Sequence, residues 1–477
     1  MDTLTRMPIK VPPYKHQQEA YEFALQRFGL LPSTIHSNGV ALLMEMGTGK
    51  TLTAIGITGA LLRSGRIRRV LVVSPLSITT VWREEFAKFA DYPYELAVLS
   101  GSTEKKKQTL QELSSTDLST AVVNYESVWR MEDAVATWKP DLIICDEGHK
   151  LKSHSTSASK AMHRLGVRAK YRLLLTGTPI TNKAIDIFSQ YKFLNPSIYG
   201  QNFYPFRNRY FFMTGYGNHT PITKKSMEAE FTAKMHSVAY RVTKAECLDL
   251  PETTDIIRPV QLEPAAMKLY KNLVDESFAE LSDGEVTATN VLTRLLRLNQ
   301  LTGGFICSDD SSKAEQVSNA KMSVLEDIVD ASLQEGKKLV IIARFIPELH
   351  AICKMLGKKG IRHSLIMGGV NNRDEQVAQF QNDPEVSVFV GQIATAGMGI
   401  TLTAASTMVF YSLDYSMSNF EQTKARIHRA GQKFPCTYLY LTAEGTIDTK
   451  VLKALKSKAS LAKTLVDDYR NGFNPFM

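Results

Sequence analysis

The first stretch of this sequence that could do chemistry is the octapeptide MEMGTGKT at residues 44–51. Gly47 and Gly49 allow the backbone to turn sharply, so that its amide groups can surround a phosphate. Lys50 can reach the β- and γ-phosphates of a nucleotide, and the hydroxyl of Thr51 can ligate magnesium. The predicted nucleotide-binding residues of the loop are Gly47, Thr48, Gly49, Lys50 and Thr51. Because the octapeptide begins with methionine instead of the usual glycine, an ordinary glycine turn before a helix is the alternative interpretation.

A pair of adjacent carboxylates, Asp146 and Glu147, follows an apolar run in LIICDEGHK at residues 142–150. Charges at the end of a buried strand are costly unless a partner neutralises them, and magnesium with a phosphate would do so. We therefore predict that Asp146 binds the metal and that Glu147 orients or deprotonates an attacking water. His149 could couple this site to another motif. An isolated Asp-Glu pair can also be a solvated strand end, but the upstream loop favours the catalytic interpretation.

Two arginines, Arg426 and Arg429, stand three positions apart in QTKARIHRAGQK at residues 422–433. This spacing predicts that both side chains lie on one face of a helix. They could act as arginine fingers on the γ-phosphate, a contribution that can reach roughly 10³–10⁵ in rate. Taken alone, two arginines on a helix are more often part of a solvated surface.

Apolar strand-like runs alternate with helical patterns in both halves of the chain, which predicts parallel sheets buried on both faces. The runs of the first half are GVALLME (39–45), RVLVVS (69–74), TAVVNY (120–125), DLIICDE (141–147) and YRLLLTGT (171–178). Those of the second half are KLVIIARF (338–345), RHSLIMG (362–368), VSVFVG (386–391), TMVFYSL (407–413) and CTYLYLT (436–442). The predicted helices include residues 51–65, 347–359, 373–382, 419–430 and 446–459.

The region between the two halves, residues 195–325, is richer in aromatic residues and helical patterns, and LDLPETTD (248–255) is a predicted linker. The stretch YGQNFYPFRNRYFFMTGYG (199–217) places aromatic residues around Arg207 and Arg209. It could be a surface that stacks on nucleic-acid bases. A satellite hydrophobic cluster in a helical protrusion is the favoured interpretation, because aromatic residues mostly build cores.

The composition of the 477-residue chain is that of a globular protein of two to four domains, with 44% hydrophobic and 22% charged residues. Its net charge of +9 is compatible with simple solubility, but it also suits a polyanionic partner such as nucleic acid. The five cysteines are scattered, which argues against a disulfide framework and a zinc site. We find neither a signal peptide nor an apolar run long enough for a membrane span, and expect a reducing, cytoplasmic location.

Taken in their order along the chain, the motifs resemble those of superfamily-two nucleic-acid motors, and among them the Swi/Snf branch of DNA-translocating ATPases. The resemblance covers most of residues 12–450, and this branch commonly lacks the first glycine of the phosphate loop. The first half contributes YKHQQEA (14–20), MEMGTGKT (44–51), VLVVSPLSITTVWREEF (70–86), VVNYES (122–127), DEGH (146–149) and LTGTPITN (175–182). The second half contributes VIIARF (340–345), GGVNNRDEQVAQFQ (368–381), GQIATAGMGITLTAAS (391–406) and QTKARIHRAGQ (422–432). One departure is Arg344, which stands where many members have serine or glutamine, so we assign it no DNA contact.

The resemblance implies an α/β fold of two RecA-like parallel-sheet domains in tandem, with helical insertions between them. We expect domain 1 at residues 1–252, with a helical protrusion near 195–250. Domain 2 is expected at residues 253–477, with a helical insertion near 260–330. ATP and Mg²⁺ would bind in the cleft between the domains, where Gln17 would read the adenine. The resemblance implies contacts to the DNA backbone from Ser74, Pro75, Leu76, Thr395 and Gly397.

The implied function is that of an ATP-dependent translocase on double-stranded DNA, a bare motor similar to bacterial and viral forms. A strand-unwinding DNA or RNA helicase is the main alternative, and its mark would be a separation pin or accessory domain. A nucleic-acid scaffold with a silent ATPase site is less well supported, because the key lysine, carboxylates and arginine are all present. A small-molecule kinase would explain the phosphate loop but not the second half. Replication, recombination and repair all remain open as pathways.

Overall fold

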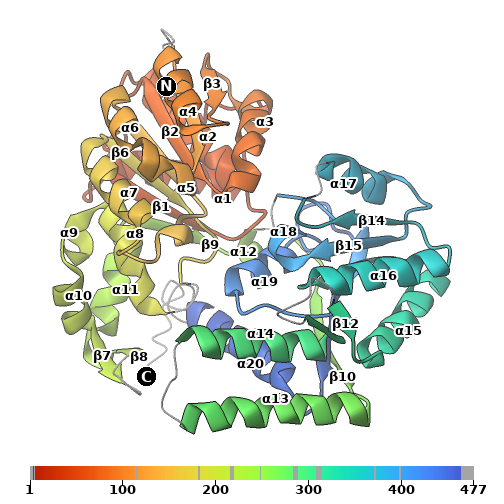
Figure 1. Cartoon of the computed structure of the whole chain (residues 1–477). Helices are drawn as coiled ribbons and strands as arrows, with labels where there is room; N and C mark the ends of the chain where they lie inside the picture. The colour runs from red at the N-terminus through yellow and green to blue at the C-terminus, as the bar shows by residue number, and fades with distance from the viewer. Residues whose placement is uncertain are drawn as a thin grey trace. The chain divides into compact units, whose positions relative to one another are not determined.

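The computed structural model describes residues 4, 6–113, 117–180, 183–214, 220–247, 249–282, 288–307, 314–369, 372–396 and 399–463. Its contacts divide the chain into two compact units, of which one holds the residues up to Asp249 and the other runs from Leu250 to Ala459. Each unit is an α/β structure built on its own sheet (Figure 1). The predicted domain limits at residues 252 and 253 stay a prediction.

The first unit is centred on a seven-stranded sheet in the order β3-β4-β2-β5-β6-β1-β9, and every pairing in it is parallel. Its strands are β1 (Gly39–Met44), β2 (Arg69–Ser74), β3 (Glu95–Val98), β4 (Ser119–Asn124), β5 (Leu142–Asp146), β6 (Tyr171–Leu175) and β9 (Ala239–Val242). The five strands predicted in this half are confirmed. The two strands that were not predicted, β3 and β9, are four residues long and form the edges of the sheet.

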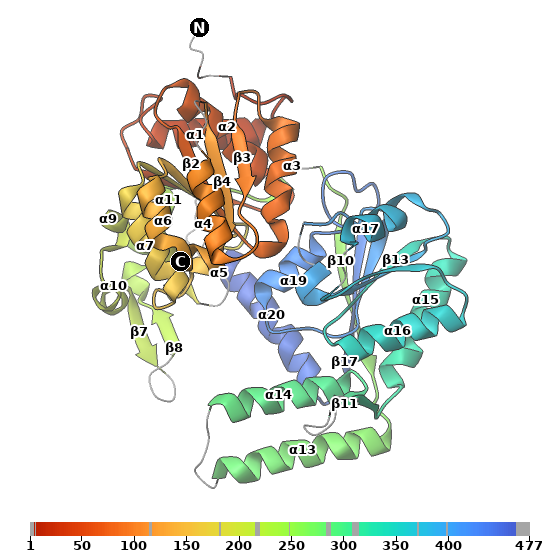
Figure 2. The same ribbon diagram turned by 45° about the horizontal axis from the view of Figure 1, so that its top comes forward.

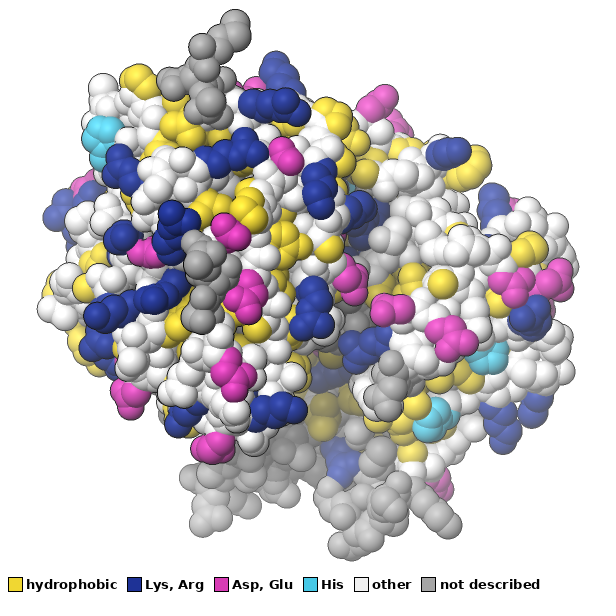
Figure 3. All heavy atoms as spheres, turned by 90° about the horizontal axis from the view of Figure 1, so that it is seen from above, with side chains coloured by type: hydrophobic (Ala, Val, Ile, Leu, Met, Phe, Trp, Pro, Cys, Tyr) yellow, Lys and Arg dark blue, Asp and Glu magenta, His cyan; other side chains and the backbone are white. Residues whose placement is uncertain are grey.

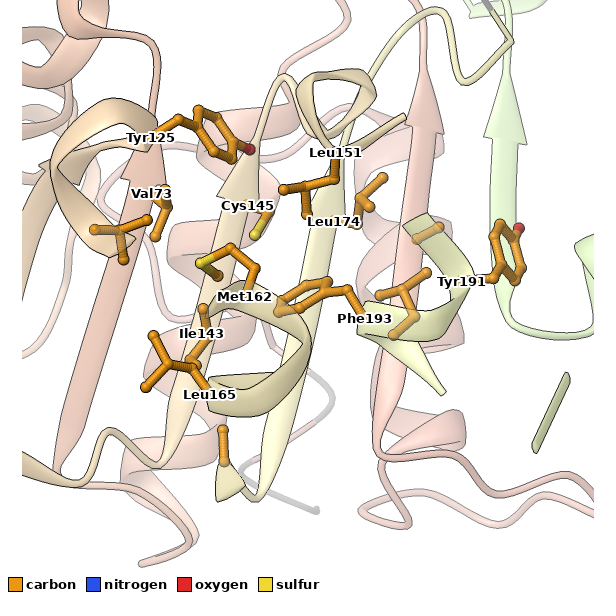
Figure 4. Packing of buried hydrophobic residues seen from close by; sticks show 14 of the residues in the cluster. Val73, Tyr125, Ile143, Cys145, Leu151, Met162, Leu165, Leu174, Tyr191 and Phe193 are labelled. Carbon is orange, nitrogen blue, oxygen red and sulfur yellow. The ribbon is translucent and has the colours of Figure 1, made fainter. Parts of the chain in front are cut away.

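Helices cover both faces of this sheet, because successive side chains of a strand point to opposite faces. Val40 and Leu42 of β1 pack in one buried cluster with residues of α1, α2 and α3, whereas Ala41 and Leu43 pack in the cluster on the other face. Figure 4 shows part of that second cluster, in which Met162 lies close to Cys145. The helices of the unit are α1 (Lys15–Arg27), α2 (Lys50–Arg63), α3 (Thr79–Phe89), α4 (Thr103–Glu112), α5 (Tyr125–Val128), α6 (Glu132–Trp138), α7 (Ser157–Arg168), α8 (Ile187–Leu194), α9 (Pro196–Tyr199), α10 (Phe203–Tyr210), α11 (Glu228–Ser237) and α12 (Lys244–Cys247).

The aromatic stretch folds mainly into a hydrophobic cluster, as predicted. Tyr199, Phe206, Tyr210 and Phe211 are buried and pack with Phe231 of α11 in the core cluster of the unit. Beyond α10 the chain also forms an antiparallel hairpin of β7 (Phe211–Thr214) and β8 (Thr220–Thr223), which was not predicted. Figure 2 shows this hairpin projecting away from the sheet of the unit.

The second unit is centred on a six-stranded parallel sheet in the order β10-β17-β16-β13-β15-β14. Its strands are β10 (Thr253–Val260), β13 (Lys338–Ala343), β14 (His363–Ile366), β15 (Val388–Gln392), β16 (Ala405–Phe410) and β17 (Cys436–Ala443). The five predicted strands are confirmed. The linker predicted at residues 248–255 is wrong in its last part, because β10 begins at Thr253 and pairs with β17 along its whole length.

Helices cover this sheet as well, and a separate pair of short strands, β11 (Phe305–Cys307) and β12 (Ala314–Gln316), lies outside it. The helices are α13 (Pro264–Ser282), α14 (Ala288–Thr302), α15 (Ala320–Gln334), α16 (Ile346–Lys358), α17 (Arg373–Asn382), α18 (Ile393–Ala396), α19 (Met417–Lys424) and α20 (Ile447–Lys463). The helix predicted at residues 419–430 corresponds to α19, which ends at Lys424, six residues before the predicted end.

Two buried polar groups tie the helices of the second unit to its sheet. The Lys321 ammonium of α15 forms an ion pair of 2.6 Å with Asp448 of α20 and donates to the carbonyl of Tyr411. Glu348 of α16 is fully buried and accepts a hydrogen bond from Ser412 at 2.5 Å. These contacts hold α15, α16 and α20 against the end of β16.

Charged side chains are spread over the surface that Figure 3 shows, where basic residues lie among acidic and apolar ones. Among the described helices, none has both the length and the apolar character that crossing a bilayer requires.

Candidate nucleotide site and strand-end loops

The predicted phosphate loop connects the end of β1 directly to the start of α2. Gly47 and Gly49 have φ values of 86° and 91°, in the left-handed region that favours glycine. Lys50 and Thr51 are the first two residues of α2, where backbone amide groups are left without partners inside the helix. This strand–loop–helix geometry presents amides and a helix N-terminus to an anion.

The Lys50 side chain folds back over the loop and is largely buried. Its ammonium donates hydrogen bonds to the carbonyl oxygens of Met44 at 3.0 Å and Glu45 at 3.3 Å. The Thr48 hydroxyl donates to the same Glu45 carbonyl at 2.7 Å. These bonds hold the loop in a closed turn with a cation at its centre.

The start of α1 fastens the loop from one side. Gln17 Nε2 donates to the carbonyl of Thr48 at 3.1 Å, and a ring nitrogen of His16 lies 2.8 Å from the same oxygen. A Cβ atom at Gly49 would lie 2.1 Å from Gln17 Nε2, so a larger residue there would displace the Gln17 amide. The structure therefore brings Gln17 onto the predicted nucleotide loop. His16 was missed, although its position beside Gln17 was visible in the sequence.

A residue far along the chain, Arg241 of β9, supports the loop from the other side. Its Nη1 atom donates to the carbonyl of Leu43 at 3.0 Å and to that of Gly177 at 3.2 Å. Its Nη2 atom lies 3.8 Å from Glu45 Oε1, and the amide of Lys244 donates to the other oxygen of this carboxylate at 2.8 Å. Sequence reasoning missed Arg241, because nothing in its local pattern points to a loop almost 200 residues earlier.

The carboxylate pair lies at the end of β5, two strands from β1 in the same parallel sheet. Asp146 is buried, and Trp82 Nε1 donates to its Oδ2 atom at 3.0 Å. The amide of Glu147 donates to Asp146 Oδ1 at 2.9 Å, and the Tyr125 hydroxyl donates to the Asp146 carbonyl at 2.8 Å. Glu147 itself has φ 50°, in the left-handed region, which is rare for a residue with a side chain.

Ionising both of these buried, adjacent carboxylates is unfavourable unless a cation neutralises them. Burial and the neighbouring Glu147 raise the pKa of Asp146 to about 7, while the Lys50 ammonium and the Trp82 hydrogen bond lower it. Lys50 and Asp146 both lie at the carboxyl ends of strands of the same parallel sheet, so the ammonium acts on this carboxylate. His149 Nδ1 lies 3.3 Å from Glu147 Oε2 and 3.4 Å from Thr176 Oγ1 after β6, so it links the ends of the two strands.

The two arginines of the second unit do not lie on one face of a helix, which corrects the prediction. Because α19 ends at Lys424, Arg426 and Arg429 belong to the turns that follow it. Their side chains nevertheless converge, since the Nη1 atom of each donates to the carbonyl oxygen of Ile400 at 3.2 Å. Shared contact with one carbonyl, and not helical spacing, brings them together.

The predicted DNA contacts that the structure describes lie at or just beyond the carboxyl ends of strands. Ser74 is the buried last residue of β2, and the Leu76 side chain two positions later is 69% exposed. Pro75 joins them and is partly buried. Thr395 is buried in α18, directly after β15, whereas Gly397 lies outside the described residues.

A side chain that sequence reasoning did not single out, Gln392, connects three strand ends in the second unit. Its Oε1 atom accepts from the Gly368 amide at 3.0 Å and from the Thr395 hydroxyl at 3.4 Å. Its Nε2 atom donates to the carbonyl of Arg344 at 3.3 Å. The loops after β13, β14 and β15 are therefore held together by one amide side chain.

A glycine-turned loop between a strand and a helix, beside a buried aspartate in a parallel sheet, is the architecture of a P-loop NTPase. The SNF2-related domain matches residues 10–304, and the helicase conserved C-terminal domain matches residues 320–431. The first match covers more than half of the chain, so the chain belongs to the SNF2-related family. The predicted membership in the Swi/Snf branch of helicase superfamily two is confirmed, and with it the tandem RecA-like α/β fold.

Similar proteins are found among DNA repair and recombination proteins. The chain is 27% identical over 479 residues to the "DNA repair and recombination protein RAD54-like" of Drosophila pseudoobscura pseudoobscura, covering 90% of this chain and 61% of the relative. It is 25% identical over 482 residues to the "DNA repair and recombination protein RDH54" of Saccharomyces cerevisiae, covering 90% and 50%. The chain thus spans about half to three fifths of the length of these relatives.

Among solved structures, the SWI2/SNF2 ATPase core of Sulfolobus solfataricus in complex with dsDNA is similar to this chain. The TM-score is 0.46 at 25% sequence identity, with 98% of this chain and 95% of the other covered.

Proposed function

We propose that this chain is an ATP-dependent motor that hydrolyses ATP on double-stranded DNA and moves along it. The observation that carries the proposal is the placement of the glycine-turned loop with Lys50 and of the buried Asp146 at the carboxyl ends of two strands, β1 and β5, of one parallel sheet. Membership of the SNF2-related family, together with a helicase conserved C-terminal domain, supports DNA as the polymer that the motor acts on.

In this proposal each residue of the nucleotide site has a defined task. The amides of residues 47–51 bind the phosphates, and Lys50 leaves the loop carbonyls to pair with the β- and γ-phosphates. Gln17 recognises the adenine from its position over the loop. Glu147 holds the attacking water. Its neighbour Asp146, whose pKa is raised, lies at the metal site.

The donor set suits Mg²⁺, because a threonine hydroxyl and a carboxylate are hard oxygen ligands. Thr51 and Asp146 would hold the ion, which would neutralise charge on the phosphate oxygens when bound. The high cost of ionising the buried Asp146 without a cation is the structural argument for this site.

The second unit contributes positive charge and a set of DNA contacts. We propose that Arg426 and Arg429 stabilise the γ-phosphate as hydrolysis proceeds. To reach it, both side chains give up their hydrogen bonds to the Ile400 carbonyl. The strand-end loops that contain Ser74, Leu76 and Thr395 contact the sugar-phosphate backbone. Such contacts are largely independent of sequence and weaken with salt.

The test is steady-state ATP hydrolysis without nucleic acid and with duplex DNA, single-stranded DNA or RNA, at two salt concentrations. We expect strong stimulation by duplex DNA, and its loss by a factor of about 10² or more in Lys50→Ala and Arg429→Ala. Lys358→Ala, which removes an exposed lysine of α16, is the matched control and should behave like the wild type.

Movement is measured separately, by the displacement of a third strand from a DNA triplex in the presence of ATP. Stimulation mainly by single strands or RNA, with separation of a forked duplex, would replace the proposal with a helicase. Absence of hydrolysis under every condition would leave only a scaffold. The names of the relatives suggest DNA repair or recombination as the setting. The cytoplasmic location expected from the sequence stays a prediction.

A further inference from the structure

The hairpin of β7 and β8 and the adjoining helix α10 carry an exposed surface that the nucleotide site does not use. Most aromatic residues of this region are buried, but the side chains of Tyr204, Phe212 and Ile222 are 65%, 58% and 53% exposed. Phe212 and Ile222 are directly opposite each other in the register of the hairpin. An apolar cross-strand pair that faces solvent costs free energy unless a partner covers it.

A positive charge lies beside each exposed ring. The Lys224 ammonium is 4.9 Å from the centroid of the Phe212 ring, and the Arg207 guanidinium carbon is 5.0 Å from that of Tyr204. Both cations are fixed by Asn208, whose carbonyl accepts from Lys224 at 2.6 Å and whose Oδ1 accepts from Arg207 at 3.2 Å. The two rings and two cations therefore form one surface, which we call the hairpin surface and define as Tyr204, Arg207, Phe212, Ile222, Lys224 and Lys225.

The charge of the surrounding chain is one-sided. No aspartate or glutamate occurs between Asp186 and Glu228, whereas this segment holds the five basic residues Lys192, Arg207, Arg209, Lys224 and Lys225. The nearby carboxylate of Glu230 is already engaged by Arg209 at 2.7 Å and by the Tyr210 hydroxyl at 2.7 Å. An acidic partner is thus favoured over an apolar or basic one.

We propose that the hairpin surface is a second DNA-binding site, which holds unpaired bases against Phe212 and Tyr204 and their phosphates against Arg207, Lys224 and Lys225. Aromatic rings with a cation at their side are the elements that bind single-stranded nucleic acid, because every base has a face for stacking and a phosphate next to it. In duplex DNA the base faces are already stacked, so the site selects DNA that has a single-stranded part. This inference rests on the proposed DNA motor and adds to it a preference for forked or tailed DNA.

The test compares the binding of three fluorescent DNAs to the full chain: a blunt duplex, a single strand, and a fork made from both. Phe212→Ala should weaken binding to the single strand and the fork by roughly 5- to 100-fold and leave the blunt duplex unaffected. Phe212→Tyr keeps the ring and should bind like the wild type. Duplex-stimulated ATP hydrolysis should persist in both variants, which shows that they are folded.

A charge variant tests the phosphate contacts. Arg207→Glu combined with Lys225→Glu should reduce the slope of log affinity against log salt on the fork by roughly 2, or about 1 for each lost phosphate contact. The matched control is Lys354→Glu combined with Lys358→Glu, which makes the same change of charge at exposed positions of α16. This control should keep the wild-type slope.

Three results would overturn the inference. Wild-type binding of the fork by Phe212→Ala would show that the ring does not stack on DNA, and an equal loss in the α16 control would show a general effect of net charge. Loss of self-association in Phe212→Ala, with DNA binding unchanged, would make the hairpin surface a contact between copies of this chain. A wild-type protein without DNA-stimulated hydrolysis would refute the motor instead, because the binding comparison does not depend on ATP.

Discussion

The most quantitative prediction concerns Glu348, which is fully buried at the start of α16. Its Oε2 atom accepts from Ser412 and from the amides of Arg344 and Phe345, whereas Oε1 has no hydrogen-bond partner within the described part of the chain. Burial raises the pKa of Glu348 from 4.5 to about 7, and these hydrogen bonds and Lys321 offset it only in part.

This pKa makes the stability of the second unit depend on pH. Between about pH 4.5 and 7 the folded protein keeps the proton on Glu348, whereas the unfolded chain releases it. The free energy of unfolding therefore falls as pH rises through this window and levels off above it. At about 1.36 kcal/mol per pKa unit, the difference between 4.5 and about 7 corresponds to about 3 kcal/mol.

Glu348→Gln keeps an oxygen acceptor for the two amides and Ser412 but cannot ionise. The assay is native-state hydrogen exchange of peptides from β13, corrected for the intrinsic exchange rate, from about pH 5 to 8. The wild type should lose about 3 kcal/mol more protection across this range than the variant does. Glu335→Gln, the same change at an exposed site, should retain the wild-type dependence.

Equal pH dependence in the wild type and in Glu348→Gln would refute the reasoning. It would mean that Glu348 is already ionised in the folded protein at low pH, so that burial does not dominate its free energy. A larger pH dependence in the variant would contradict the sign of the effect.

The remaining predictions concern the loops and a buried ion pair. Gly49→Ala should raise the KM for ATP roughly tenfold. A φ of 91° costs a residue with a Cβ about 1–2 kcal/mol, and the added Cβ displaces Gln17. An unchanged KM in ATP titrations would contradict this prediction. Gln392→Leu should raise the DNA concentration that gives half-maximal ATP hydrolysis about tenfold, because the substitution loosens three loops. The rate at saturating DNA should not fall. A fall in that rate alone would argue against the prediction. Lys321→Met should cost the second unit about 3–5 kcal/mol by leaving Asp448 buried and unpaired, and an unaltered urea midpoint would exclude that.

Local patterns were sufficient for much of the fold and the site. The ten predicted strands are present because continuous apolar runs such as RVLVVS become β-strands when both faces of the sheet are covered. The phosphate loop was also predictable from a local pattern, because the glycines with φ above 80° and Lys50 all lie within one short stretch. The edge strands β3 and β9 were missed because four residues carry too little pattern.

Features that depend on contacts between distant segments could not be predicted. Trp82 and Tyr125 support Asp146 from α3 and α5, and neither residue has a sequence signal for that role. Arg426 and Arg429 were assigned to a helix from their spacing, but they converge through the Ile400 carbonyl, which belongs to another loop. The position of β10 as a strand was hidden because its side chains are mostly exposed and its sequence resembles a linker.

The support that Arg241 gives to the phosphate loop has a consequence for the synthesis of the chain. β9 pairs with β1 along four residues, and Arg241 donates to the Leu43 carbonyl of β1 and forms an ion pair with Glu45 of the loop that follows. During translation the nucleotide loop emerges from the ribosome early, but the strand and the arginine that fix it follow almost 200 residues later. At about 5–20 residues per second, this delay lasts on the order of 10 to 40 seconds. The nascent first unit therefore cannot complete its nucleotide loop until β9 has emerged, so ATP binding by ribosome-bound chains should begin only beyond that length.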